Sequence, residues 1–197
     1  MFDDEISHKT MLNILNDLSP FKNSYVIGFI LIIVTSFILS PYLTNYAGFL
    51  PFSVSMKLAS TQVKLLNDLI IIYFILICLL MLFKYMLIGL SLPVIQNFKN
   101  AAKNPNRNVK KDVGENPKKQ ILYTALFLLL INLLWVWIFG FTSAGNSKIL
   151  RNILKDSNFF INLYIVLGFL GNLYLFIFSI LMIEGRKYVV FLEPVHD

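Results

Sequence analysis

The sequence predicts an all-α integral membrane protein with four transmembrane helices and an N-terminal amphipathic helix. Of its 197 residues, 57% are hydrophobic and only 14% are charged, whereas soluble domains are about 45–50% apolar and about 25% charged. A chain this short has too much surface for its volume to bury the excess in a water-soluble core. Four apolar stretches approach or exceed the roughly 20 residues needed to cross a bilayer. Lipid is therefore the solvent that this composition fits.

The four predicted spans are too long and too uniformly apolar for the strands of a membrane barrel, which alternate between two faces. They cover residues 25–43, 69–90, 121–141 and 159–183. The sequence thus divides into a cytoplasmic amphipathic segment at 1–24, a four-span helix bundle at 25–183 and a cytoplasmic tail at 184–197.

Basic residues predict the orientation of the spans, because cytoplasmic loops carry an excess of Lys and Arg. The loop at 96–120 holds Lys99, Lys103, Arg107, Lys110, Lys111, Lys118 and Lys119. Four spans then place both termini inside as well, and these add Lys9, Lys22, Arg186 and Lys187. The outer loops hold fewer, namely Lys57, Lys64, Lys148, Arg151 and Lys155. We expect a multi-pass protein of the cell (inner) membrane with both termini cytoplasmic.

The N-terminal segment has the apolar spacing of an amphipathic helix. Met11, Ile14, Leu15 and Leu18 recur at the helical period. Ser7 is a candidate cap at the start of the helix, and Pro20 should end it. Two interpretations stay open: a helix lying in the membrane interface, or a helix covering the cytoplasmic end of the bundle.

The loops on the outer side carry weaker patterns. Apolar and polar residues alternate over 52–59, which suggests an extended segment, and the second helix should start near Ser60 or Thr61. The stretch 147–155 places its apolar and basic residues on different faces, so we expect a short interfacial helix there.

Lys84 is the only basic residue inside a predicted span, about six residues from its cytoplasmic end. A charged side chain at this depth is costly unless it is paired or reaches the headgroups. One interpretation makes Lys84 a pore or substrate contact, and the other an interface residue whose stem bends toward the cytoplasm. Glu184, at the same end of the fourth span, is its candidate partner.

Small and amide side chains form a stripe on the fourth span that is typical of helix packing or of an oligomer seam. Its residues are Gly168, Asn172 and Ser179, and Gly171 widens the small surface. Asn132 lies near the middle of the third span, and we expect it to contact Asn172, since an amide facing lipid would be unsatisfied. Trp135 and Trp137 lie toward the outer end of the third span, where aromatic belts occur.

The sequence contains no recognisable catalytic motif, such as a P-loop, G-x-S-x-G or H-E-x-x-H. Its two histidines lie near the termini, and it has a single cysteine, Cys78. We therefore expect no enzyme activity, no cofactor and no metal site.

These observations favour a non-enzymatic membrane subunit or accessory protein that acts through helix packing and its basic loop. A small component of a larger membrane assembly, or of an immunity or defence system, would fit. The expected partners are anionic headgroups, other membrane subunits or further copies of the chain, and a cytoplasmic protein at 96–120; nucleic acid is not expected. The first alternative is a homo-oligomeric pore or channel, and a more distant one is a small transporter.

Overall fold

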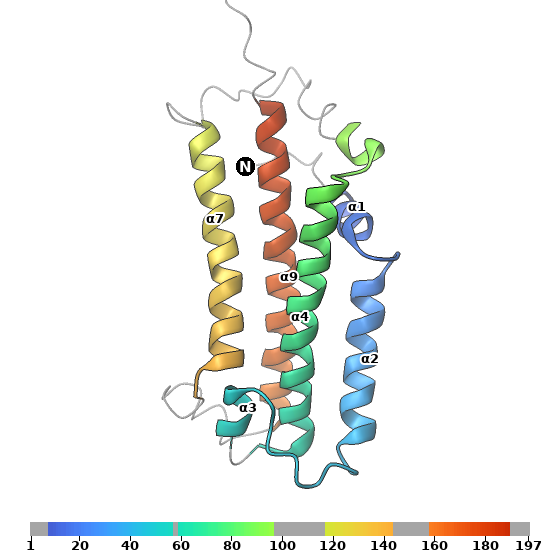
Figure 1. The fold of residues 1–197 in the computed structure, drawn as a ribbon, viewed down its shortest axis with the longest axis vertical. Helices are drawn as coiled ribbons and strands as arrows, with labels where there is room; N and C mark the ends of the chain where they lie inside the picture. The colour runs from blue at the N-terminus through green and yellow to red at the C-terminus, as the bar shows by residue number, and fades with distance from the viewer. Residues whose placement is uncertain (1–7, 57–58, 97–116, 144–157, 190–197) are drawn as a thin grey trace, which may run out of the picture. The chain divides into compact units, whose positions relative to one another are not determined.

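Within residues 8–56, 59–96, 117–143 and 158–189, which the computed structural model describes, every regular element is a helix (Figure 1). The elements are α1 (His8–Leu18), α2 (Ser24–Leu39), α3 (Pro51–Ser55), α4 (Thr61–Leu87), α7 (Pro117–Val136), the π-helical turn η1 (Trp137–Phe141) and α9 (Asn158–Val189). Residues 92–96 add one further helical turn. The all-helical prediction is confirmed for the described residues.

Three of the described helical stretches are long and apolar enough to cross a membrane. They are Thr61–Leu87, Lys119–Phe141 and Phe159–Gly185, and they contain the second, third and fourth predicted spans. α4 begins at Thr61, as predicted. Its first two turns contain polar residues and precede the apolar stretch, so the helix is longer than the predicted span. The membrane character of the chain thus depends on three helices found by length and composition.

The first predicted span corresponds to α2, which has 16 residues, rather than to a helix of full membrane length. At about 1.5 Å per residue α2 is about 24 Å long, short of the roughly 30 Å of a hydrocarbon core. Its side chains are apolar and largely exposed, and only Ser24 and Ser36 are buried. α2 is therefore the one predicted span whose length does not establish a crossing.

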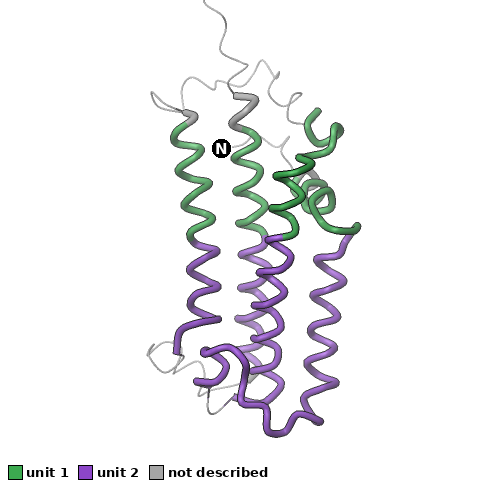
Figure 2. Tube along the Cα trace, viewed as in Figure 1, with its two compact units in different colours: residues 1–22, 80–130, 174–197 green, residues 23–79, 131–173 purple. Residues whose placement is uncertain are grey.

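The chain divides into two compact units (Figure 2). Unit 1 comprises residues 1–22, 80–130 and 174–197, and unit 2 comprises 23–79 and 131–173. The boundary passes through α4, α7 and α9, so each of these helices contributes residues to both units.

α1 packs into unit 1 through the apolar residues that the helical spacing identified. Ile14 and Leu18 are fully buried and Leu15 nearly so. The helix ends at Leu18, two residues before Pro20, and the hydroxyl of Ser19 donates a hydrogen bond to the carbonyl of Leu15 (2.6 Å). The predicted stop is therefore correct, because proline cannot continue the hydrogen-bonding pattern.

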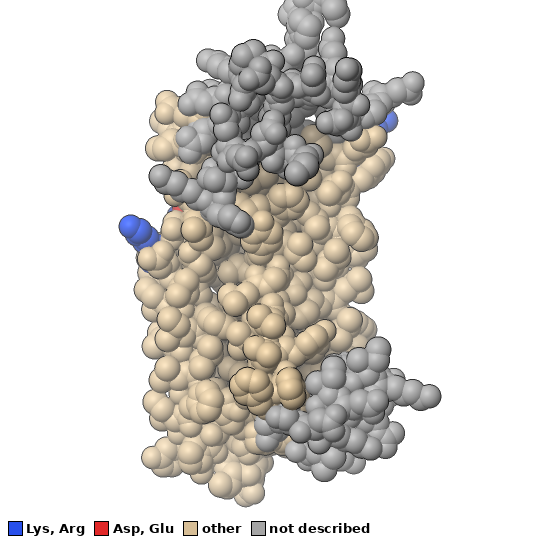
Figure 3. Space-filling model, turned by 180° about the vertical axis from the view of Figure 1, so that it is seen from behind, with Lys and Arg blue, Asp and Glu red and all other residues tan. Residues whose placement is uncertain are grey.

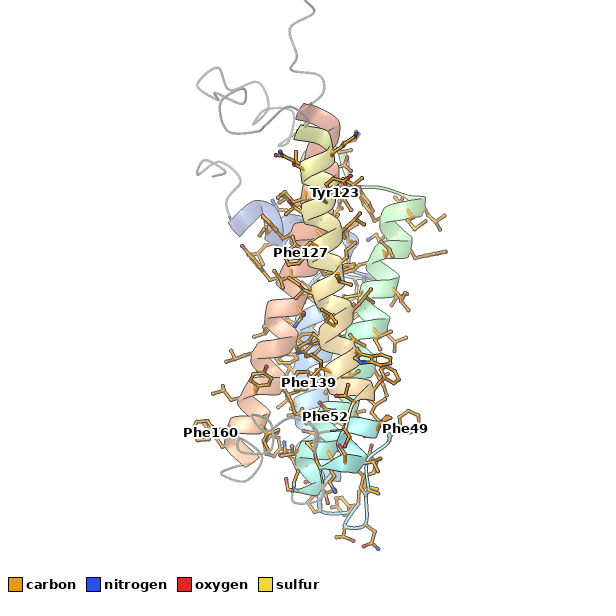
Figure 4. The ribbon with its side chains drawn as sticks, turned by 90° about the vertical axis from the view of Figure 1, so that its left-hand side faces the viewer. Phe49, Phe52, Tyr123, Phe127, Phe139 and Phe160 are labelled. Carbon is orange, nitrogen blue, oxygen red and sulfur yellow. The ribbon has the colours of Figure 1, made fainter. Side chains whose placement is uncertain are left out.

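The extended segment predicted over 52–59 is wrong where the structure describes it, because Pro51–Ser55 forms the short helix α3. Pro51 occupies a first-turn position, where its fixed φ favours a helix and its missing N–H costs nothing. Phe52 and Ser53 are buried on one side, and Phe52 packs against Phe139 (Figure 4). Alternation over so few residues did not distinguish a strand from one helical turn.

Several predictions lie outside the described residues. These are the Ser7 cap, the basic loop from 97 to 116, the helix at 147–155 and the tail from 190 onward. Lys118 and Lys119, assigned to the basic loop, instead belong to the first turn of α7, which begins at Pro117.

The exterior of the described residues is apolar. Figure 3 shows one face covered by uncharged side chains, with basic groups only near its margins. Phe37, Phe83 and Phe127 are each about 60% exposed. Large exposed apolar areas of this kind mark membrane or protein contact surfaces.

Candidate functional site

In unit 2, α9 packs antiparallel against the C-terminal end of α7 and the η1 turn that follows it. The rings of Phe139 and Tyr164 lie 5.3 Å apart, and the indole of Trp135 lies against Gly168. Moving four residues back along the chain from Phe139 to Trp135 moves the contact four residues forward, from Tyr164 to Gly168. This is the pattern expected of two antiparallel helices in contact.

Gly168 is required by close packing with Trp135. A Cβ built on Gly168 would lie 2.6 Å from the indole Nε1 and 3.1 Å from Cε2, closer than van der Waals contact permits. Trp135 packs between two other aromatic rings. Its ring centroid lies 5.2 Å from that of Phe74 and 5.7 Å from that of Phe139. Glycine at this position lets α9 approach the indole, as small residues do between membrane helices.

The predicted hydrogen bond between Asn132 and Asn172 is absent. Asn172 donates from Nδ2 to the carbonyl of Gly168 on its own helix (2.8 Å), and neither side-chain amide oxygen accepts a hydrogen bond. Asn132 takes part in another interaction. Both side chains are nonetheless buried, 5% and 7% exposed, so both face protein as predicted.

The two tryptophans differ in environment. Trp135 is 8% exposed and belongs to the core of unit 2, whereas Trp137 is 59% exposed. Only Trp137 therefore has the exposure expected of a belt residue, and including Trp135 in the belt was wrong. The two residues project differently because about 200° of helical rotation separates them.

The predicted stripe on α9 lies mostly inside the chain. Ser179 is fully buried and donates to the carbonyl of Leu175 on its own helix (2.8 Å). Gly171 is different, because nothing lies within 4 Å of a Cβ built there. Of the stripe, Gly168 contacts Trp135 of α7, Asn172 is buried beside it on α9, and Gly171 remains on an open surface.

A second polar cluster, not predicted from the sequence, forms around Asp68 in unit 2. Its carboxylate is 1% exposed and accepts hydrogen bonds from Tyr46 Oη (2.6 Å), Phe49 N (2.5 Å) and Leu50 N (3.3 Å). The carboxylate thereby fixes the segment between α2 and α3, where Gly48 adopts a positive φ of 105°. Burial, the hydrogen bond to Asp68 and the negative charge of that carboxylate all raise the pKa of Tyr46.

Asn67 joins three elements beside this cluster. Its Nδ2 donates to Ser53 Oγ on α3 and to the carbonyl of Phe139 in η1, both at 3.0 Å. Asn67 is fully buried. A π-helical turn disturbs the usual backbone pairing, and the carboxamide of Asn67 takes up a carbonyl of that turn.

In unit 1, Lys84 binds a backbone carbonyl. Its Nζ donates to the oxygen of Ser19 (2.9 Å), just beyond α1. Glu184 is 4% exposed and accepts a hydrogen bond from the hydroxyl of Tyr85 (2.7 Å). The hydrogen bonds thus give Lys84 and Glu184 different partners, and the residue next to Lys84 is the one that contacts Glu184.

A third contact attaches α1 within unit 1. Asp17 accepts a hydrogen bond from the backbone N–H of Ser91 (2.6 Å). Lys84 and Asp17 thus connect the end of α1 to α4 and to the residues that follow it. In the described part of the chain, these two charged side chains bind backbone groups and thereby hold neighbouring segments together.

The described residues form helix contacts and bury several side-chain amides. Among the described residues no group of three or more His, Cys, Asp or Glu side chains could hold a metal ion. Sequence reasoning missed Asn67 and Asp68, although two consecutive polar residues at the start of an apolar stretch were a usable signal.

Comparison of the chain with protein-family models, with curated proteins and with solved structures gives no match.

Proposed function

We propose that this protein is a non-enzymatic, multi-pass membrane subunit that acts by packing against another membrane protein. One observation carries the proposal: of the membrane-length part of α7 only 17% is buried, against 50% for α4 and for α9. Tyr123 and Phe127 on α7 are 65% and 60% exposed (Figure 4). α7 therefore presents an apolar surface to lipid or to a partner helix, and we favour the partner.

Charge placement in the described residues supports a role in contacts rather than in transport. Asp68, Asp17 and Lys84 each hold a backbone group of a neighbouring segment. A pore made by several copies would need Asn172 and Ser179 to face water, yet both are buried in the chain. An accessory subunit requires no such opening.

The experiment is photo-crosslinking in native membranes. A photoreactive residue at Phe127 or Leu130 on α7 should give one discrete adduct with another protein, and the same residue at Leu76 on α4, which is 53% exposed, should give lipid adducts only. Protein adducts of twice the chain mass would favour self-association. Lipid adducts alone from α7 would contradict the proposal.

We further propose four spans, with α2 as the first, and both termini in the cytoplasm of the inner membrane. The apolar, exposed side chains of α2 support this, and a short span can be accommodated by local thinning of the bilayer. α1 would then lie as an amphipathic helix at the cytoplasmic end, and the basic loop at 96–120 would attract anionic headgroups by about 1 kcal/mol per basic residue.

Cysteine labelling in sealed vesicles tests this topology. With Cys78 replaced by Ser, a cysteine near residue 5 and one near residue 108 should label from the same side if α2 crosses. If α2 does not cross, the two positions will label from opposite sides. A cysteine near residue 150 gives the reference for the outer side.

A further inference from the structure

Two buried side chains that border Gly168 in unit 2, Trp135 and Asn172, carry polar atoms at the α7–α9 contact. Trp135 is 8% exposed, and its indole N–H has no hydrogen-bond partner. Asn172 is 7% exposed, and its Oδ1 also has none. In lipid, leaving the indole N–H of Trp135 and Oδ1 of Asn172 without a hydrogen bond is unfavourable.

The two atoms are chemically complementary but do not bond to each other. Trp135 Nε1 is a donor only, and Oδ1 of Asn172 is an acceptor only. The carbonyl of Gly168 accepts from Nδ2 of Asn172, which fixes how the carboxamide is turned. If the carboxamide of Asn172 were flipped, Oδ1 would face the carbonyl oxygen of Gly168, and two acceptors would then repel each other.

We propose that this site binds a water molecule that bridges Trp135 Nε1 and Asn172 Oδ1 inside the membrane-spanning part of unit 2. Water is small, uncharged and able to accept from the indole while donating to the amide oxygen. Buried waters typically make about three hydrogen bonds to otherwise unsatisfied groups. The contact residues contribute no charge, so an ion is not the expected occupant.

The site is a property of the helix contact and does not depend on the proposed accessory role. A bridging water would give α7 and α9 a hydrogen bond between helices that the side chains do not make directly. This contact would be released by removing either partner atom.

The test uses the Trp137→Phe variant, in which Trp135 is the only tryptophan, with 15N-labelled indole in lipid nanodiscs. Rotating-frame spectra should show a dipolar cross-peak between the indole proton and water, opposite in sign to a cross-peak from proton exchange. Asn172→Leu should abolish the cross-peak and move the indole proton upfield. Ser179→Ala, which also removes a buried polar group from α9, should leave both unchanged.

Two outcomes would overturn the proposal. A downfield indole proton without a water cross-peak means that Trp135 bonds directly to a protein oxygen. An upfield proton without a cross-peak means that the site is dry. Both are read from the Trp137→Phe protein itself, so the test holds even if Asn172→Leu does not fold; Asn172→Ser then serves as the milder variant.

Discussion

The contact between Gly168 and Trp135 predicts that Gly168→Ala will destabilise the protein. The added Cβ would lie 2.6 Å from Nε1 of Trp135 and 3.1 Å from two further ring atoms. The indole cannot easily move away, because the rings of Phe74 and Phe139 pack against it. Inserting an atom into a packed core typically costs about 1–3 kcal/mol.

Helix propensity acts in the opposite direction and must be separated from the clash. Alanine is favoured over glycine in a helix interior by about 1 kcal/mol. Gly171 provides the matched control, since it lies in the same helix and nothing is within 4 Å of its built Cβ. The free energy of unfolding of Gly168→Ala should therefore fall below that of Gly171→Ala by about 1–3 kcal/mol.

The assay is equilibrium unfolding in mixed lipid–detergent micelles, followed by far-UV circular dichroism. A double-mutant cycle localises the effect: in a Trp135→Phe background the ring atoms nearest Gly168 are gone, so the cost of Gly168→Ala should drop by at least half. Equal stabilities of Gly168→Ala and Gly171→Ala, within about 0.5 kcal/mol, would refute the packing argument.

Three further predictions concern the hydrogen-bonded charges. Asp68→Asn should lower the free energy of unfolding by about 3 kcal/mol or more, and at least twice as much as Tyr46→Phe, because it disturbs three hydrogen bonds rather than one; equal losses in micelle unfolding would contradict this. Because the pKa of Tyr46 is raised in the folded state, stability should fall as pH rises above about 10, where the unfolded chain ionises first, and Tyr46→Phe should fall less steeply in a pH series. Lys84→Met should cost about 1–3 kcal/mol by leaving the Ser19 carbonyl unsatisfied, whereas Lys22→Met, at an exposed position, should change stability by less than about 0.5 kcal/mol.

Hydropathy identified the three long helices because a membrane span can be recognised from the composition of its own residues, without knowledge of the rest of the chain. It does not by itself establish a crossing at α2, where an apolar run of suitable length contains a helix of only 16 residues. The alternation pattern was misleading at α3, where Pro51 begins a helical turn that a period of two did not reveal.

The side-chain partners could be predicted only in part. Asn132 and Asn172 were expected to be buried because lipid excludes them, and they are. Lys84 was assigned to Glu184 because charges are visible in a sequence, whereas its observed acceptor is the backbone of Ser19. The Asp68 cluster was missed for the same reason, since two of its three donors are backbone N–H groups.

The π-helical turn at Trp137–Phe141 makes the C-terminal end of α7 tolerant of changes in chain length. A π turn accommodates one residue more than an α turn, and most arise as single wide turns within α-helices. Loss of one residue there could be absorbed by tightening the turn, leaving the Trp135–Gly168 alignment upstream in place. What such a deletion would remove is the carbonyl that Asn67 holds.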